Sequence, residues 1–409
     1  MFGAGLLIAA ALAGPVGPDA GLAPLGAVGD EPRTINASFA QRSYRPGDVA
    51  YLAVKSPVQG VTFRVFHCAP PAARALVDDR MSGVPVTDAA AASRRIAIRI
   101  GDWASGLYFA RLDAPGGRLG FAPFVVGPRR LGTSRVAVVL PTNTWQAYNF
   151  RDVDRDGIGD TWYADARIHS VDLTRPFLNR GVPPNFRGYN EGFLWWLGLH
   201  AEAVDVLADD DFERVRNGAQ LQRLYDLVIF CGHEEYVSSH MYDVVQAYRD
   251  RGGNLAFLSA NNFYYRVERH GHRLFKIGHW SDVGRTGERL NGVVYVGWSR
   301  KRFPNRPYVV TGARRAPWFF RGTGVRNGTR FGIYGIEIDQ RGPRSPRGII
   351  VLARIPNAFG TGRSAEMTYY TTSAGAKVFS AGVMNFGGSA LWPTVSRILE
   401  NLWERTSRP

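Results

Sequence analysis

Short segments in which apolar and polar residues alternate dominate the chain between about Thr34 and Val126. Turn residues such as those of Arg45–Asp48 separate these segments, and no helical period runs through them. Regular short strands of this kind are typical of a β-sandwich, which we predict for residues 31–127. The predicted strands include Val49–Val54, Thr62–Phe66, Ile96–Ile100 and Leu107–Leu112.

Beyond Arg130 the pattern changes to continuous apolar runs that alternate with amphipathic helices. The run Arg135–Leu140 (RVAVVL) has the composition of a strand buried on both faces. This alternation predicts an α/β domain over residues 133–409, with a doubly wound, mainly parallel sheet. A β-rich stretch at about 274–367 interrupts it, and we expect an insertion that elaborates the α/β sheet, returns to it and could form a lid over the site. The main expected helices are Glu191–Ala201, Asp211–Leu224, Ser238–Arg251 and Pro393–Arg405, and further buried strands are Leu227–Cys231, Leu255–Leu258 and Lys377–Gly382.

Polar residues gather where three of the buried strands end, in Pro141–Asn149, Gly232–Tyr236 and Ser259–Asn262. In open α/β sheets, ligands bind outside the carboxyl ends of the strands, so we predict the functional site at these segments. His233 and Glu235 are two residues apart, and in an extended loop their side chains project to the same side. The alternative is a helix start at which acidic residues complement the dipole.

An acidic loop follows the first of these segments. Asp152, Asp154, Asp156 and Asp160 occupy positions 1, 3, 5 and 9 of a calcium loop, with a glycine at position 6. The carbonyl of Ile158 would supply position 7. Position 12 is a tyrosine instead of glutamate, so the loop is not a complete EF-hand. We predict a structural Ca²⁺ here; the alternative is an Asp/Gly turn stabilised by its own backbone hydrogen bonds.

Two residues offer nucleophilic chemistry instead of metal chemistry. Ser259 follows a buried strand where a hydrolase of this topology carries its nucleophile, and His233 would be its base. The glycines of a nucleophile elbow are missing around Ser259. Cys231 is a second candidate, although a cysteine at the end of a buried strand more often acts as a small apolar residue.

Charge and composition narrow the class of protein. The formal net charge is +15, and only four of the 50 basic residues are lysines. The arginines are scattered along the chain, and no zinc-finger or RNP-like pattern accompanies them, so we expect no nucleic-acid partner. Two cysteines exclude a disulfide-framework scaffold. No long uncharged apolar run follows the N-terminus, so we expect no integral membrane contact.

The first residues, Met1–Ala20, carry an apolar stretch followed by small residues, as a signal peptide does, but lack its positive start. We treat residues 1–30 as a signal-like or disordered leader. It favours a secreted or cell-envelope protein, with a cytoplasmic one as the alternative. A homo-oligomer is compatible with the sequence.

A set of short motifs runs through the second part of the chain. They are TWQAYN (144–149), DTWY (160–163), TRPF (174–177), GHEEY (232–236), GGNLAFLSANN (252–262), YGIEID (334–339) and KVFSAG (377–382). In order and spacing they resemble the C-terminal catalytic region of the N,N-dimethylformamidase large (beta) subunit and its relatives, over about Arg135–Arg405. The resemblance implies a fold like that of class I glutamine amidotransferases, in agreement with the α/β prediction. It also implies an amidase that uses iron(III).

The resemblance implies an iron site made of two tyrosines and a glutamate. Glu235 matches the glutamate, and Tyr148 is the best match for the first tyrosine. Tyr163 is the expected second tyrosine, with Tyr189 as a weaker candidate. Trp145 stands where relatives often carry a tyrosine, so the ligand set departs from the family pattern there. Phenolate and carboxylate oxygens suit a hard trivalent metal.

The same resemblance assigns roles to three further residues. His233 matches the active-site histidine, Asn261 the asparagine after the buried strand, and Glu337 a general base. The implied reaction is metal-assisted hydrolysis of the C–N bond of a small-molecule amide. Glu337 or His233 would take the proton from water, and Asn261 would donate to the oxyanion. The alternatives are a serine or cysteine hydrolase and a non-catalytic exported protein that binds Ca²⁺ or another ligand.

Overall fold

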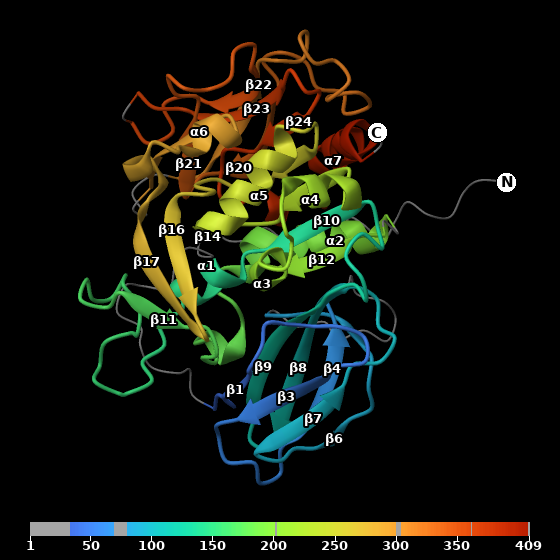
Figure 1. Cartoon of the computed structure of the whole chain (residues 1–409), viewed down its shortest axis with the longest axis vertical. Coiled ribbons are helices and arrows are strands. Elements are labelled where there is room, and N and C mark those ends of the chain that lie inside the picture. The colour runs from blue at the N-terminus through green and yellow to red at the C-terminus, as the bar shows by residue number, and fades with distance from the viewer. Residues whose placement is uncertain (1–32, 69–79, 201–202, 300–303, 361, 408–409) are drawn as a thin grey trace, which may run out of the picture.

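The fold is described from a computed structural model of the chain, shown in Figure 1. The structure describes residues 33–68, 80–200, 203–299, 304–360 and 362–407. The signal-like leader, residues 1–30, lies outside these ranges. Within them, no helix is both long and apolar enough to cross a membrane.

Two sheets built from the first part of the chain face each other across one apolar core (Figure 1). Alternation along each strand creates this core: in β7, Ile96 and Ile98 are buried while the arginines on either side are exposed. One sheet has the order β1 (Ala37–Phe39), β3 (Val49–Val54) and β7 (Arg95–Arg99). The other has the order β2 (Ser43–Tyr44), β9 (Arg118–Val126), β8 (Gly106–Ala114), β4 (Thr62–His67) and β5 (Val84–Pro85), with β6 (Ala90–Ala91) also pairing with β4.

A mixed nine-stranded sheet forms the centre of the rest of the molecule. Its first five strands are parallel to one another, and the following four pair antiparallel. The parallel strands are β12 (Asp205–Ala208), β10 (Val136–Leu140), β13 (Leu227–Phe230), β15 (Asn254–Phe257) and β24 (Lys377–Ser380). The antiparallel strands are β23 (Ala365–Thr371), β22 (Ile350–Ile355), β19 (Arg306–Val310) and β20 (Arg330–Tyr334).

The prediction of a doubly wound, mainly parallel sheet of the glutamine-amidotransferase type is therefore wrong. Strands make up 33% of the structure and helices 20%, and the chain forms several mixed and antiparallel sheets. The stretch at about 274–367, expected as an insertion that elaborates the sheet, supplies the strands β19, β20 and β22 to it. Its role as a lid over the site stays a prediction. The apolar pattern identified individual strands, but it does not encode the direction in which neighbouring strands pair.

Helices cover both faces of the parallel strands, because alternate residues of each strand point to opposite sides. Val136, Val138 and Leu140 of β10 share one core with α2 (Gly192–Leu199) and α7 (Pro393–Thr406). Ala137 and Val139 share the other with α4 (Gly218–Leu224) and α5 (Ser239–Arg249). The single helix predicted at Asp211–Leu224 is two, since α3 (Asp209–Phe212) ends early and Asn217 caps the start of α4.

A four-stranded sheet that includes β11 lies at the edge of the molecule (Figure 1). Its order is β11 (Ser170–Asp172), β17 (Arg273–His279), β16 (Tyr265–His270) and β14 (Tyr236–Ser238). A small core of aromatic and aliphatic side chains, including Trp162 and Tyr236, joins this sheet to α1 (Thr142–Ala147). A two-stranded pair, β18 (Val294–Trp298) and β21 (Glu337–Gln340), completes the surroundings of the site described next.

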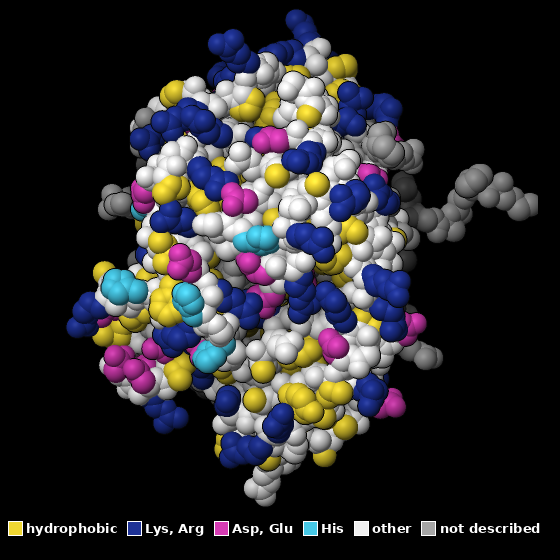
Figure 2. Space-filling view, viewed as in Figure 1, with side chains coloured by type: hydrophobic (Ala, Val, Ile, Leu, Met, Phe, Trp, Pro, Cys, Tyr) yellow, Lys and Arg dark blue, Asp and Glu magenta, His cyan; other side chains and the backbone are white. Residues whose placement is uncertain are grey.

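Basic side chains are spread over the face shown in Figure 2, with acidic and apolar side chains between them. The expectation of no nucleic-acid partner stays a prediction, as do the proposed domain boundaries and the secreted or cell-envelope location.

Candidate active site

The three polar segments predicted from the strand ends meet in space. They follow β10, β13 and β15, which are adjacent and parallel, so their carboxyl ends lie at one edge of the sheet. Hydrogen bonds join the segments, among them two from backbone N–H groups: the Glu235 backbone N donates to Thr144 Oγ1 at 3.1 Å, and the Glu234 backbone N donates to Asn262 Oδ1 at 3.1 Å.

Two tyrosines and a glutamate converge here. The hydroxyls of Tyr163 and Tyr148 are 2.8 Å apart, and their rings stack with centroids 4.5 Å apart. The Tyr163 hydroxyl lies 3.3 and 3.4 Å from the two carboxylate oxygens of Glu235. Asn261 Nδ2 donates to Glu235 Oε1 at 3.1 Å. The structure thus brings together four of the six residues assigned to the catalytic and iron site.

The other two residues, His233 and Glu337, complete the cluster. His233 Nε2 lies 3.5 Å from Glu235 Oε2 and 3.8 Å from Glu337 Oε2. Both His233 Nε2 and Glu337 Oε2 are buried, and neither has a hydrogen-bond partner within the described residues. The Asn261 Oδ1 atom is in the same condition. Buried polar atoms are normally paired, so these three atoms indicate that the site receives a ligand, a cation or water.

The GHEEY loop places its side chains alternately, as expected for extended chain. His233 and Glu235 face the tyrosines, whereas the buried carboxyl of Asp209 is the electrostatic neighbour of Glu234. The alternative prediction, that the loop starts a helix, is wrong: β14 begins at Tyr236, and α5 begins only at Ser239.

Burial controls the protonation of the cluster. It raises the pKa of Glu235 to about 8, although hydrogen bonds from Tyr148, Tyr163 and Asn261 oppose the shift. Burial, and then the neighbouring Glu235, raise the pKa of Glu337 well above its ordinary value. Burial lowers the pKa of His233 to about 3. Without a cation the cluster therefore favours neutral carboxyl and imidazole groups.

The donor set fits a hard cation. Burial and the nearby carboxylates also raise the pKa values of Tyr148 and Tyr163, so both phenols stay protonated unless a positive charge lies against them. The Tyr163 hydroxyl lies within hydrogen-bond distance of both the Tyr148 hydroxyl and the Glu235 carboxylate, and these phenol and carboxylate oxygens are hard ligands. A trivalent cation at their meeting point would offset the cost of ionising all three.

Two backbone positions beside the cluster lie in the left-handed region. Asn261 has φ +52° and Ile336, directly before Glu337, has φ +70°. A β-branched residue rarely adopts this conformation, and such strain gathers at functional sites. The Asn261 backbone N donates to both carboxylate oxygens of Asp339, at 2.9 and 3.0 Å. Asp339 was missed from the sequence, although it ends the YGIEID motif that carries Glu337.

A small cavity borders the cluster. Its volume is about 20 Å³, room for one or two waters. Tyr189 lines it together with Trp145, but among the described residues no hydrogen bond links Tyr189 to Glu235. No lysine or arginine is among the cavity-lining residues, which are Pro141, Thr144, Trp145, Tyr148, Pro184, Asn185, Tyr189, Asn190, His233, Ile336, Glu337 and Met384.

The two alternative nucleophiles are poorly placed. Ser259 is fully buried and its hydroxyl donates to the carbonyl of Met384 at 2.9 Å. Within the described residues, no hydrogen bond joins Ser259 to His233. Cys231 is also buried, and burial raises the pKa of its thiol to about 12, which disfavours the reactive thiolate.

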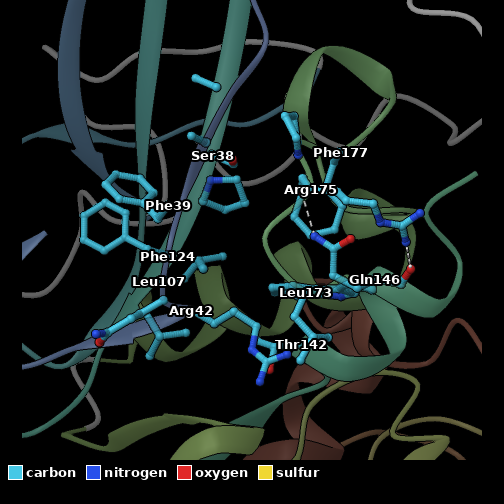
Figure 3. Close-up of a pocket in the computed structure, with 17 residues that line it drawn as sticks. Ser38, Phe39, Arg42, Leu107, Phe124, Thr142, Gln146, Leu173, Arg175 and Phe177 are labelled. Carbon is cyan, nitrogen blue, oxygen red and sulfur yellow. Dashed lines mark hydrogen bonds between the residues drawn. The ribbon is translucent and has the colours of Figure 1, made fainter. Parts of the chain in front are cut away.

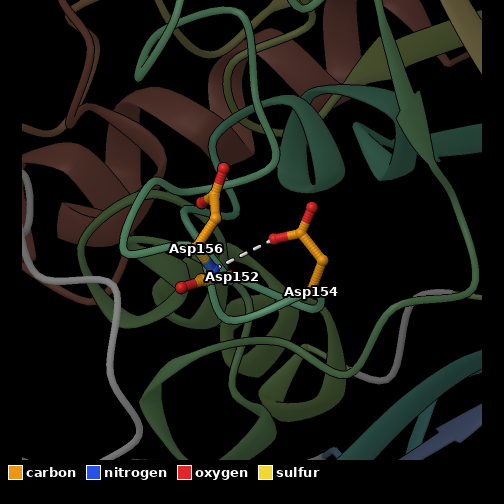
Figure 4. Close-up of side chains that lie close together, drawn as sticks. All are labelled: Asp152, Asp154 and Asp156. Carbon is orange, nitrogen blue, oxygen red and sulfur yellow. Dashed lines mark hydrogen bonds between the residues drawn. The ribbon is translucent and has the colours of Figure 1, made fainter.

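The acidic loop brings the carboxylates of Asp152, Asp154 and Asp156 within 4.8 Å of one another (Figure 4). Backbone N–H groups already occupy several of its oxygens: Asp152 accepts from Arg155 and Gly157, and Asp160 accepts from Val153 at 2.7 Å. The Ile158 backbone N donates to Asp156. These bonds agree with a self-stabilised turn, while the cluster also offers oxygens to a cation, so the Ca²⁺ site stays a prediction.

Arg175 ties the acidic loop to the tyrosine cluster. Its buried guanidinium donates to Gln146 O at 2.7 Å, near the end of α1, and to Asp160 O at 2.6 Å. The first carbonyl lies two residues before Tyr148 and the second three residues before Tyr163. Arg175 also lines a cavity of about 40 Å³ between α1 and the N-terminal sheets, into which Arg42 and Phe39 extend (Figure 3).

A buried cluster of phenol, carboxylate, imidazole and amide groups, held at the ends of parallel strands, defines this molecule as a candidate hydrolase. Residues 92–394 match the family described as N,N-dimethylformamidase beta subunit-like, C-terminal. The chain belongs to this family, which confirms the resemblance seen in the motifs.

Two relatives carry the name N,N-dimethylformamidase beta subunit. The protein from Paracoccus aminophilus is 23% identical over 318 residues, covering 62% of this chain and 38% of that protein. The protein from an Alcaligenes species is 26% identical over 161 residues, covering 35% of this chain and 18% of that protein. The match therefore spans less than half the length of either relative.

Among solved structures, a Paenibacillus cycloisomaltooligosaccharide glucanotransferase aligns with a TM-score of 0.17 and 11% identity, over 56% of this chain and 45% of that one. A likeness this weak supports no conclusion about fold or function.

Proposed function

We propose that the chain is a metal-dependent hydrolase that cleaves the C–N bond of a small amide, with iron(III) held by Tyr148, Tyr163 and Glu235. The observation that carries the proposal is the chain of contacts from the Tyr148 hydroxyl to the Tyr163 hydroxyl, at 2.8 Å, and from the Tyr163 hydroxyl to the buried Glu235 carboxylate, at 3.3 Å. Membership of the N,N-dimethylformamidase beta subunit-like family supports the amide as substrate. When bound, iron(III) supplies a Lewis acid that polarises the amide carbonyl and makes water more acidic.

The remaining residues of the cluster handle protons and charge. Glu337 and His233 present unpaired polar atoms 3.8 Å apart beside the proposed ligands, where either can take a proton from the attacking water. Returning that proton to the amine as the C–N bond breaks balances the hydrolysis. Asn261, which donates to Glu235 in the resting site, supplies an amide N–H to the developing oxyanion.

The walls of the site favour an uncharged substrate. The buried carboxyl group of Glu337 lines the cavity, and none of its lining residues is a lysine or arginine that would bind an anionic group. A substrate with a carboxylate of its own would lose its hydration there with no cationic side chain among the lining residues to compensate. A small neutral amide avoids this cost, and this is the partner we propose.

Replacing Glu235 by alanine tests the ligand assignment. We expect Glu235→Ala to remove stoichiometric iron while thermal unfolding stays cooperative, because the change leaves the phenols without their shared carboxylate. Glu234→Ala is the matched control, since Glu234 projects away from the tyrosines and should leave iron content unchanged. Iron retained by Glu235→Ala would refute the assignment.

A further inference from the structure

Tyr236, the last residue of the GHEEY motif, lies behind the proposed iron ligands and has no role in the mechanism above. It is fully buried at the start of β14. Its hydroxyl forms a short hydrogen bond with the hydroxyl of Tyr163. On its other side, Trp162 Nε1 donates to the same Tyr236 hydroxyl at 3.1 Å.

Ionisation of Tyr163 would set the direction of these hydrogen bonds. An indole N–H can only donate, so the oxygen of Tyr236 accepts from Trp162. Between the two tyrosine hydroxyls either oxygen can be the donor while both are protonated. A Tyr163 phenolate has no proton to give, so as a metal ligand it would accept the one proton of the Tyr236 hydroxyl.

Packing holds Tyr236 in place for this contact. Its ring stacks on Tyr265, with centroids 5.1 Å apart and planes inclined by 7°, because β14 and β16 pair these two residues directly. Lys276 Nζ lies over the rings of both Tyr265 and Trp162, at 5.1 and 5.4 Å. The backbone oxygen of Tyr236 accepts from Asn143 Nδ2 at 3.2 Å, which links it to α1.

The other neighbours of the Tyr163 oxygen do not supply such a donor once the site is loaded. Glu235 and Tyr148 are themselves proposed ligands and would be ionised. Tyr236 therefore makes the two tyrosines unequal: Tyr163 would bind as a hydrogen-bonded phenolate, whereas among the described residues no hydrogen bond from Tyr236 to Tyr148 is found.

We propose that Tyr236 is a positioning residue that donates a hydrogen bond to the Tyr163 ligand oxygen and so sets the strength of the Tyr163–iron bond. This inference rests on the proposed iron site. Residues that hydrogen-bond to a metal ligand without contacting the metal typically change metal affinity by about ten- to a hundredfold when they are replaced.

The test compares iron affinity and the visible tyrosinate-to-iron absorption band in the whole chain and its variants. Tyr236→Phe should still bind one iron, about ten- to a hundredfold more weakly, with the band moved to longer wavelength, because a phenolate without a hydrogen-bond donor gives up electron density more easily. Tyr265→Phe is the matched control: it removes the same atom from the stacked ring and should leave both readings unchanged. Trp162→Phe, which removes the donor to Tyr236 together with part of a buried ring, should shift the band in the same direction by less, and it replaces Tyr236→Phe should that variant not fold.

The outcomes separate the two proposals. A band and affinity unchanged in Tyr236→Phe, with the wild type loaded, would overturn the role of Tyr236 alone. Complete loss of the band at saturating iron would also overturn it, since Tyr236 would then be a ligand. A wild type that binds no iron would refute the proposed function, and this inference with it.

Discussion

The chain places two oxygen-rich clusters within a few residues of each other, and they differ in how their oxygens are satisfied. In the acidic loop, Asp152, Asp154 and Asp156 are largely exposed, and backbone N–H groups occupy much of their hydrogen-bonding capacity. In the tyrosine cluster, Glu235 and Glu337 are buried, and unpaired polar atoms face the centre. Solvent and backbone hydrogen bonds stabilise the loop without a cation, whereas burial makes the ionised cluster depend on one.

Glu337→Gln should produce the largest change in activity. We expect about a 10²- to 10⁴-fold lower rate of amide hydrolysis, with iron content unchanged, because the variant keeps the shape of the side chain but cannot accept a proton. The rate is measured as amine release from the small amide that the wild type cleaves. Equal rates in both proteins would remove Glu337 from the reaction and leave His233 as the base.

Metal-free protein should lose stability as the pH rises from about 4.5 to 8. Glu235 has a pKa of about 8 in the folded chain against an ordinary value of 4.5, so in this window the folded chain keeps a proton that the unfolded chain releases. The free energy of unfolding then falls with rising pH, by about 1.4 kcal/mol per pH unit for each such proton. Denaturant unfolding across this range measures the slope.

Glu235→Gln is the control for this prediction, since glutamine does not titrate. The variant should lose the contribution of one proton and have a shallower slope between pH 4.5 and 8. The same slope in both proteins would show that Glu235 is already ionised in the metal-free fold, against the picture of a cluster kept neutral by burial.

A smaller effect is expected at the acidic loop. If the predicted Ca²⁺ binds, added calcium should stabilise the wild type, and Asp154→Asn should abolish that response while changing stability in its absence by no more than about 0.5 kcal/mol. Asp102→Asn, a similar change at a side chain that is 92% exposed, is the matched control. The measurement is the shift of the thermal unfolding temperature on adding calcium. An equal shift in the wild type and both variants would show that the loop is a self-stabilised turn and not a Ca²⁺ site.

Local spacing predicted the site better than it predicted the sheet. The positions of His233 and Glu235 followed from alternation in an extended loop, and the strand ends placed Tyr148 and Asn261 near them. The antiparallel half of the sheet was missed because apolar runs do not record pairing direction, as for β22 and β23. Tyr236 was missed because its partners, Trp162 and Tyr163, lie over 70 residues away in the chain. The one sequence signal that pointed to Tyr236 was its place as the last residue of the GHEEY motif.

The most direct test is elemental analysis of the purified chain with its visible spectrum, comparing the wild type with Tyr148→Phe. The account predicts one iron per chain and a tyrosinate-to-iron band that Tyr148→Phe weakens, because one of two phenolate ligands is removed. Calcium alone, no metal, or an iron spectrum that Tyr148→Phe leaves unchanged would contradict it.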